Sequence, residues 1–247
     1  MRITILGNCQ TFIFNWRDKF DSTLAIESAL HGCVDSVDVI NSSADDYRAY
    51  WHNISEDSYF TAQFQKALEL HDSESIFLHI QGDTSYNNWN KLVQDARHYM
   101  QKYNAGIYYP KVKNVEWYDD NITTIQTMHA PDENIKYIAT GDETVWFIHP
   151  KVIEYIKSEK LDRCFDGNVT GWGWDTVMCA ASHILGMPVI RDDNHHIEHP
   201  KSTNYDLQQA FDEYDKLKTK LPEEIQWYIH HTITTGKRFL FKKYFDQ

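Results

Sequence analysis

The segment GWGWD, from Gly171 to Asp175, combines residue types that suit sugar chemistry. Tryptophan rings offer flat apolar faces to the C–H face of a sugar ring, and an aspartate can accept a proton from a hydroxyl group. The two glycines would let a ligand approach the backbone closely. In this interpretation Asp175 is a general base, and Trp172, Gly173 and Trp174 contact the substrate. The structural alternative is a helix start, where the helix dipole favours a carboxylate.

A second candidate is the segment QGD, from Gln81 to Asp83, which follows an apolar run that reads as a buried strand. Strand side chains alternate between two faces, so His79, Gln81 and Asp83 would share one face if the strand continues. A carboxylate at the mouth of a strand can hold a divalent cation, because hard cations prefer oxygen ligands. A single aspartate after a strand is also a common turn former, so QGD alone does not decide between the two.

Histidines and acids are concentrated between Arg191 and Pro200, in the segment RDDNHHIEHP. Imidazole is a common metal ligand near neutral pH. The string from His195 through Glu198 to His199 also matches the H-x-x-E-H pattern of inverted zinc peptidases, which places both histidines on one helix face. The polar residues before this string and the proline after it favour a loop or a short strand. A zinc hydrolase and a solvated polar loop are therefore carried as alternatives.

Trp146, in the segment GDETVWFIHP, is a further aromatic candidate with Asp142 and Glu143 nearby. It could extend the surface that contacts a sugar. It could equally be a buried aromatic residue of a strand, because its neighbours are apolar and β-branched.

Periodicity places these candidates in an alternating α/β chain. Strands are expected at 2–6, 37–40, 75–80, 106–109, 136–138, 144–148 and 188–191. Helices are expected at 12–30, 59–70, 88–103, 151–158 and 175–185. Two further helices are expected after Leu207, separated near Leu221, because Pro222 and the glutamates after it suit a first turn. This order predicts a mostly parallel central sheet flanked by helices, with C-terminal helices.

Ligands of such sheets bind outside the carboxyl ends of the strands. This rule selects three loops with the sequences GNCQ, NSSADD and QGDTSY. Their candidate residues are Gly7, Asn8, Gln10, Asp45, Asp46, Gln81 and Asp83.

The net charge of −12 over 247 residues argues against a protein whose whole surface binds a phosphate backbone. The last twelve residues, GKRFLFKKYFDQ, are basic and aromatic, and they could contact an anionic acceptor or a membrane surface, or pack on the core. No stretch approaches the roughly 18 to 20 apolar residues of a membrane span. The four cysteines show no C-x-x-C spacing, and the start lacks the apolar region of a signal peptide. We therefore expect free thiols and a soluble cytoplasmic protein without stable membrane insertion.

Taken together, the order of QGD, GWGWD and a histidine before PKSTNYD resembles the GT-A class of nucleotide-sugar glycosyltransferases. It is most similar to the branch related to β-1,4-galactosyltransferases, in which a WGWG-E-D type segment precedes a metal-binding histidine. The resemblance spans residues 2–204 and implies a GT-A, Rossmann-like fold. It also implies that Asp83 and His199 hold Mn²⁺ or Mg²⁺, with His196 and His195 in reserve, and that Asp175 is the base. Gln81 stands where the first aspartate of the D-x-D motif would be.

The resemblance further implies a role for each remaining candidate. Gly7, Asn8, Gln10, Asp45, Asp46, Gln81 and Asp83 would bind the donor, which is expected to be UDP-linked. Trp146, Trp172, Gly173 and Trp174 would bind the acceptor. We predict one domain over 1–247, with a donor-binding half at 1–110, an acceptor and metal half at 111–206 and a helical extension at 207–247.

The expected reaction is inverting, metal-assisted transfer of a sugar to an acceptor hydroxyl. The acceptor is expected to be a glycan, such as a surface polysaccharide, or a hydroxymethylated DNA base as in bacteriophage relatives, which would act in the host cytoplasm. Two alternatives stay open. One is a non-catalytic sugar- or nucleotide-binding protein, favoured by Gln81, and the other is a zinc hydrolase that uses His195, Glu198 and His199.

Overall fold

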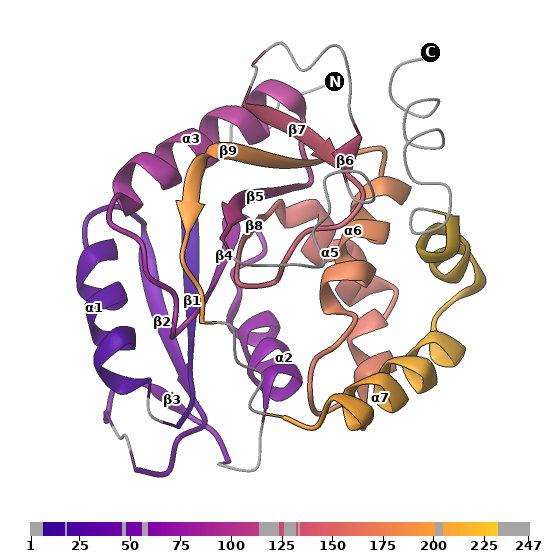
Figure 1. Cartoon of the computed structure of the whole chain (residues 1–247), viewed down its shortest axis with the longest axis horizontal. Coiled ribbons are helices and arrows are strands. Elements are labelled where there is room, and N and C mark those ends of the chain that lie inside the picture. Colours follow the sequence, from indigo (N-terminus) through magenta and orange to yellow (C-terminus); the bar gives the residue numbers. More distant parts are fainter. Residues whose placement is uncertain are drawn as a thin grey trace.

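The computed structural model describes residues 7–17, 19–45, 48–55, 59–113, 124–125, 132, 134–200 and 205–231. The described part is built on a nine-stranded sheet in the order β3-β2-β1-β4-β8-β5-β9-β7-β6, with helices on both faces (Figure 1). Strands β8 and β7 run antiparallel to the other seven. The architecture is therefore the mixed, mostly parallel α/β sheet that the sequence predicts.

The strands and helices have the following bounds. The strands are β1 (Cys9–Asn15), β2 (Ser36–Asn41), β3 (His52–Asn53), β4 (Ile76–Gln81), β5 (Ile107–Val112), β6 (Thr124–Ile125), β7 (Ile135–Ile138), β8 (Val145–Ile148) and β9 (Val189–Ile197). The helices are α1 (Phe20–Leu30), α2 (Phe60–Leu70), α3 (Trp89–Tyr103), α5 (Pro150–Ser158), the 3-10 helix η1 (Leu161–Phe165), α6 (Trp174–Ile184) and α7 (Leu207–Lys220). Residues 223–231 are also helical.

The first strand is the largest correction to the sequence prediction. The sequence predicts a loop and the start of a helix for the segment CQTFIFN, but this segment forms β1, and the helix begins only at Phe20. Its side chains are almost all buried, because β1 lies between β2 and β4 and is covered on both faces. Threonine, isoleucine and phenylalanine favour such a strand. The strand predicted at 2–6 lies outside the described residues.

Strand β9 is the second correction. The polar stretch after Arg191 was expected to be a loop or a short strand, but β9 continues to Ile197. Its pairing with β5 contains a bulge, since Pro110 pairs with Asp192 and Lys111 with His196. A bulge interrupts the regular pairing and changes the direction in which the side chains of the bulged strand point.

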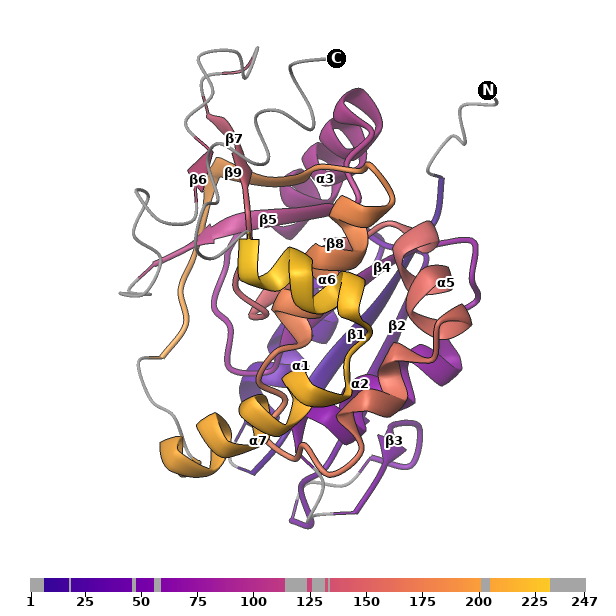
Figure 2. The same ribbon diagram turned by 90° about the vertical axis from the view of Figure 1, so that its right-hand side faces the viewer.

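Other predicted elements agree with the structure. The helices expected at 59–70, 88–103, 151–158 and 175–185 start and end within one residue of α2, α3, α5 and α6. Helix α7 and the helical residues 223–231 confirm two C-terminal helices separated at Leu221. Figure 2 shows both on the face that carries α5 and α6. No helix in the described ranges is long and apolar enough to cross a membrane.

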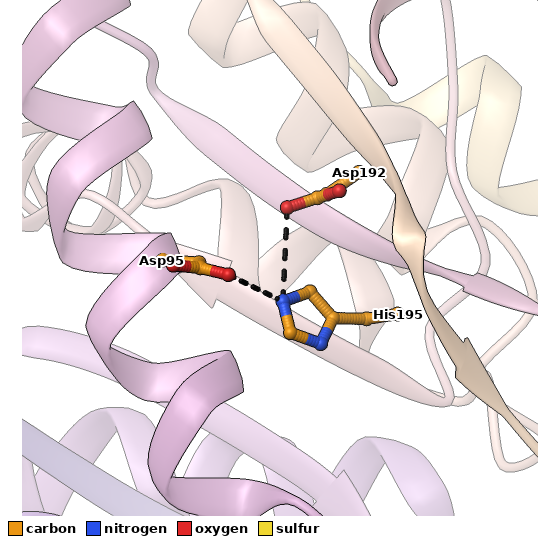
Figure 3. Close-up of side chains that lie close together, drawn as sticks. All are labelled: Asp95, Asp192 and His195. Carbon is orange, nitrogen blue, oxygen red and sulfur yellow. Dashed lines mark hydrogen bonds and ion pairs between the residues drawn. The ribbon is translucent and has the colours of Figure 1, made fainter.

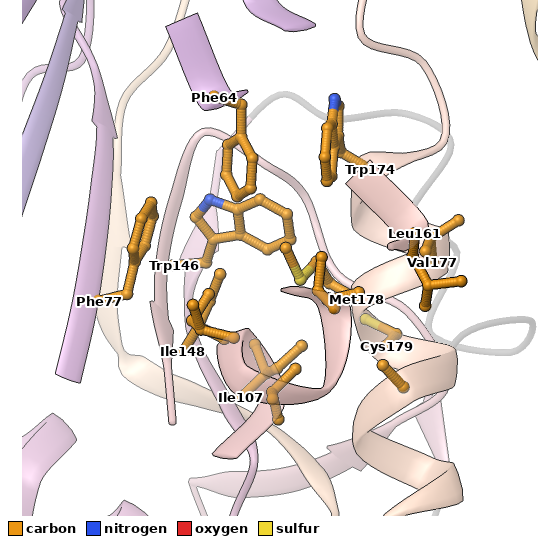
Figure 4. Close-up of a cluster of buried hydrophobic side chains, with 14 of the residues drawn as sticks. Phe64, Phe77, Ile107, Trp146, Ile148, Leu161, Trp174, Val177, Met178 and Cys179 are labelled. Carbon is orange, nitrogen blue, oxygen red and sulfur yellow. The ribbon is translucent and has the colours of Figure 1, made fainter. Parts of the chain in front are cut away.

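Two hydrophobic layers enclose the sheet. One layer packs beneath α1 and α3, and the other packs beneath α2, α5, α6 and α7. Trp146 lies in the second layer, surrounded by side chains that include Phe64, Phe77 and Trp174 (Figure 4). All four cysteines, which lie within the described ranges, are free thiols as expected.

Candidate active site

Asp83, Gln81 and His199 meet at the carboxyl end of β4. Gln81 is the last residue of this strand, and the chain then turns through Asp83. The Nε2 atom of His199 lies 2.9 Å from Oε1 of Gln81 and 3.2 Å from Oδ1 of Asp83. The structure thus brings His199 beside Gln81 and Asp83, which lie more than a hundred positions earlier in the sequence.

A short bridge between backbones holds His199 beside this turn. The N–H of Ser85 donates to the carbonyl of Glu198 at 2.9 Å, and the N–H of Glu198 donates to the carbonyl of Ser85 at 3.0 Å. This pairing continues the line of β9 and delivers the next residue, His199, to the end of β4.

The electrostatics of the Asp83 and His199 pair favour binding of a positive charge. Burial lowers the pKa of His199, but the Asp83 carboxylate and the charge of Asp142 outweigh it, so the pKa of His199 is raised. The Oδ1 atom of Asp83 is buried, and the contact that the structure gives it is the His199 imidazole at 3.2 Å. A buried carboxylate is costly unless a positive group or a metal ion compensates its charge. The carboxylate, the imidazole and the amide oxygen of Gln81 form a donor set that suits a hard divalent cation.

Asp175 lies in the first turn of α6, where its Oδ1 atom accepts hydrogen bonds from the Thr176 N–H at 2.7 Å and from the Thr176 hydroxyl at 3.0 Å. The side chain is half-buried. Burial raises the pKa of Asp175 to about 6, against the two bonds from Thr176 and with a further upward contribution from Asp142. Asp175 is therefore mainly ionised at neutral pH and accepts a proton more readily than an ordinary aspartate.

Two further acids, Asp142 and Glu143, link these groups. They occupy the turn before β8, where the carbonyl of Thr144 accepts the N–H of Gln81 at 2.9 Å. The charge of Asp142 raises the pKa values of both His199 and Asp175, so it is close to both. The charges of Asp175 and Asp142 add to the effect of burial on Glu143, whose pKa is raised well above its usual value. From the sequence, Glu143 is recognisable only as a neighbour of Trp146, because the burial of its Oε2 atom near other acids depends on the tertiary structure.

Two of the predicted aromatic contacts are wrong, because Trp146 and Trp174 are fully buried. The ring of Trp174 stacks on Phe165 with a centroid distance of 3.7 Å, and its Nε1 atom donates to the Thr61 hydroxyl at 3.3 Å. Trp146 packs against Phe64 on the same side of the sheet (Figure 4). Neither ring can contact a substrate in this arrangement.

Trp172 keeps part of its surface exposed. Its Nε1 atom donates to the Tyr205 hydroxyl at 2.5 Å, and its ring meets the exposed Phe211 edge-on at 5.0 Å. Of the tryptophans proposed as acceptor contacts, Trp172 is the one that a sugar could reach.

Gly173 also has a different role from the predicted contact with a ligand. Its φ of 105° is a conformation that glycine adopts at little cost. A Cβ atom at this position would come within 2.7 Å of Leu217 and 2.9 Å of Tyr214, both from α7. The space beside Gly173 is therefore filled by the protein itself, and this glycine sets the start of α6.

Three predicted donor contacts lie at the wrong end of the sheet. Gly7 and Asn8 precede β1, and the pairing of β1 with β4 places Gln81 opposite Phe14. At about 3.3 Å per residue, Asn8 is roughly 20 Å from Gln81 along the strand direction. Gln10 is bonded to Asp38 and to the carbonyl of Leu70. The error follows directly from the misplaced first strand. Of the NSSADD loop, Asp45 is exposed beyond the carboxyl end of β2, and Asp46 lies outside the described residues.

The remaining histidine candidates do not join Asp83. His196 is exposed in β9. His195 points toward Asp95 of α3 and Asp192 of β9, and ligand atoms of these three residues lie within 4.8 Å of one another (Figure 3). This geometry is compatible with a divalent metal. The zinc hydrolase pattern is wrong here, because His195 and His199 lie on extended chain and face different partners, while Glu198 is exposed and pairs with Lys113.

The group around His195 is nevertheless well paired without an ion. The Nε2 atom of His195 lies 2.9 Å from Oδ2 of Asp95, and its Nδ1 atom lies 2.6 Å from the Tyr86 hydroxyl. Asp192 accepts the Tyr108 hydroxyl at 2.9 Å. These bonds fasten α3 to β9.

We therefore expect His195→Ala to lower the free energy of unfolding by about 1 to 3 kcal/mol, since it removes a shared partner from buried polar groups. Urea denaturation measures the change. His196→Ala is the matched control, and its exposed position predicts a change within about 0.5 kcal/mol. Equal stability of the two variants would contradict a fastening role for His195.

Comparisons with known proteins add information about the fold. No family model and no curated protein matches the sequence. Among solved structures, the chain is similar to residues 1–349 of TarS from S. aureus, with a TM-score of 0.57 and 9% sequence identity over 96% of this chain and 74% of that chain. The fold is that of the GT-A glycosyltransferases. A glycosyltransferase involved in the glycosylation of the major capsid of PBCV-1 matches with a TM-score of 0.46 and 12% identity, over 87% of this chain and 98% of that chain.

Proposed function

We propose that this protein is a glycosyltransferase that moves a sugar from a nucleotide-sugar donor, expected to be UDP-linked, to an acceptor hydroxyl. The observation that carries the proposal is the arrangement around the turn before β8. Asp83 and His199 offer ligands for a cation, while Asp175 offers a carboxylate with a pKa of about 6. The charge of Asp142 acts on both His199 and Asp175, and the chain has the GT-A fold.

Asp175 is the general base in this proposal. The acceptor hydroxyl gives its proton to the Asp175 carboxylate as its oxygen forms a bond to C1 of the donor sugar. The bond from C1 to the nucleotide breaks, and its electron pair leaves with the diphosphate. A single base of this kind suits attack from the face opposite the leaving group, which inverts the configuration at C1. Trp172, half-buried beside Tyr205, would offer its ring to the acceptor.

Asp83 and His199 would hold the divalent cation, Mn²⁺ or Mg²⁺, and the buried Oδ1 atom of Asp83, which lies 3.2 Å from the imidazole, fits this role. When bound, the cation would neutralise charge that develops on the departing diphosphate. Gln81 replaces an acid of the D-x-D motif with a neutral amide, and its oxygen orients the imidazole of His199. The neutral side chain lowers the negative charge available to a cation.

Asp83→Asn should raise the Mn²⁺ concentration needed for half-maximal activity by at least about 10- to 100-fold, the loss that even outer partners of metal ligands cause. Titration of activity with Mn²⁺ in chelator-treated protein measures the shift. Glu198→Gln is the matched control, because this exposed acid precedes His199 but pairs with Lys113. A Mn²⁺ response in Asp83→Asn that equals that of the wild type would remove Asp83 from the cation site.

The acceptor is proposed to be a glycan or a hydroxymethylated DNA base. The deciding experiment is mass spectrometry of reactions with a panel of UDP- and GDP-sugars, Mn²⁺, and either oligosaccharides or hydroxymethylated DNA. A mass increase of one sugar residue on the acceptor supports transfer. The neutral Gln81 favours one second candidate function, which is a protein that binds a nucleotide sugar without turnover. Binding of a nucleotide sugar with neither transfer nor hydrolysis would support that candidate.

A further inference from the structure

Glu143 is an acid of the candidate active site that the reaction proposed above does not use. It lies in the turn before β8, next to Thr144, whose carbonyl accepts the N–H of Gln81. The Oε2 atom of Glu143 is buried and has no hydrogen-bond partner among the described residues. Glu143 thus stands beside the residue that is bonded to the end of β4, and the charge of Asp175 in α6 acts on it.

An ionised carboxylate in this position would be strongly disfavoured. A buried charge without a partner loses its hydration and gains nothing in return. The charges that act on Glu143 come from Asp175 and Asp142, and like charges oppose ionisation further. The pKa of Glu143 is accordingly raised well above its usual value, with burial as the main cause.

Among the described residues, the charges that act on Glu143 in the metal-free protein are those of Asp175 and Asp142, and both are negative. Asp142 precedes Glu143, and Tyr205 lies close enough that the charge of Glu143 raises its pKa. Asp175 in turn raises the pKa values of two groups behind it, which are Tyr214 of α7 and Cys179 of α6. The two aspartates therefore favour the protonated form of Glu143.

Neighbouring carboxyl groups in different protonation states can recognise a pair of hydroxyls. The ionised Asp175 accepts a hydrogen bond, whereas a protonated Glu143 donates one. A sugar carries several hydroxyls within reach of one another. One of them can give its proton to Asp175 while a second accepts the hydrogen bond from Glu143.

We propose that Glu143, held as the neutral acid, donates a hydrogen bond to a second hydroxyl of the acceptor and so selects a neutral saccharide. This inference deepens the proposed function, because it rests on Asp175 facing the acceptor. It separates the two acceptor classes, since a hydroxymethylated base offers a single hydroxyl on a strand of negative phosphates.

The first test measures the protonation state and does not depend on activity. The folded-state pKa of Glu143 lies above that of the unfolded chain, about 4.3, so its protonation stabilises the fold below that pH and the benefit is lost as the pH rises toward the folded value. Relative to Glu143→Gln, the wild type should lose about tenfold in its folding equilibrium constant per pH unit from about pH 5 upward. Urea denaturation from pH 5 to 9 measures this ratio. Glu154→Gln, the same change at an exposed position of α5, should run parallel to the wild type.

Equal pH dependence of the wild type and Glu143→Gln would show that Glu143 is ionised, and it would overturn the inference. A ¹³C NMR titration of labelled glutamate carboxyls gives a second measurement on the unaltered protein. The expected result is one carboxyl that titrates well above the ordinary range of glutamate and is missing from Glu143→Ala.

The second test measures acceptor binding by calorimetry with a panel of neutral oligosaccharides and hydroxymethylated DNA. Glu143→Gln keeps a hydrogen-bond donor of similar shape and should bind the saccharide within about threefold of the wild type, whereas Glu143→Ala should bind about tenfold more weakly. Unchanged binding by Glu143→Ala, equal loss in both variants, no saccharide binding by the wild type, or preference for DNA would each overturn the inference. Saccharide binding with the expected pattern but without sugar transfer would support the inference and reject only the transfer reaction.

Discussion

Asp175→Asn should lower the turnover of sugar transfer by about 10²- to 10⁴-fold while donor binding stays near the wild-type value. The amide keeps the size of the side chain and its place beside Thr176, but it cannot take the proton of the acceptor hydroxyl. Turnover is measured by single-sugar transfer at saturating donor, and donor affinity is measured by calorimetry. Asp21→Asn is a suitable control, because Asp21 is an exposed acid in the first turn of α1.

The pH dependence gives the same prediction an independent readout. Asp175 must be ionised to act as a base, so kcat/KM of the wild type should be low below pH 6 and should rise as the pH increases through about 6. The residual activity of Asp175→Asn should not show this rise with pH. Full turnover in the variant, or an unchanged rise with pH, would show that another group takes the proton.

The raised pKa of Asp175 also has a consequence for stability. Protonation of a group whose folded pKa lies above its unfolded value stabilises the fold, and this contribution is lost as the pH rises through about 6. Asp175→Asn should therefore be more stable than the wild type above pH 6. A gain of stability together with a loss of turnover is typical of a residue kept for its chemistry.

The regular elements with long, clear periodicity could be predicted from the sequence. The amphipathic α3 and the apolar run of β4 are examples, and both are found within about one residue of the expected bounds. β1 could not be placed from the local pattern, because a fully buried strand in the middle of the sheet loses the alternation that distinguishes a strand from a buried helix. As a result, the loop that the sequence assigns to donor binding lies at the amino ends of the strands and not at their carboxyl ends.

The candidate site could be predicted from the sequence only in part. Asp83 lies two residues after the end of β4, and the carboxyl ends of parallel strands bring such residues together whatever their distance in the sequence. The role of Glu143 could not be predicted, because the burial of one acid among others depends on how β8 and α6 pack. The bulge in the pairing of β9 with β5 likewise depends on tertiary structure and not on the local pattern.

Trp174→Ala should lower the free energy of unfolding by about 3 to 5 kcal/mol, the range for deleting a large buried aromatic side chain. The ring of Trp174 is fully buried, stacks on Phe165 and packs at 4.5 Å from Phe64, so its removal leaves a cavity between α6, η1 and α2. Guanidinium denaturation measures the loss. Trp174→Phe keeps an aromatic ring and should recover a large part of it.

Trp172→Ala is the matched control, two positions earlier in the same segment. Its ring is half-buried and keeps a hydrogen bond to Tyr205, so its removal should cost only about 1 kcal/mol of stability and should weaken acceptor binding instead. The two tryptophans differ because Gly173, with its φ of 105°, turns the chain into α6 between them and directs one ring inward and the other toward the surface. If both variants lost stability equally and acceptor binding stayed intact in Trp172→Ala, the whole GWGWD segment would be part of the core, and the acceptor would have to bind elsewhere.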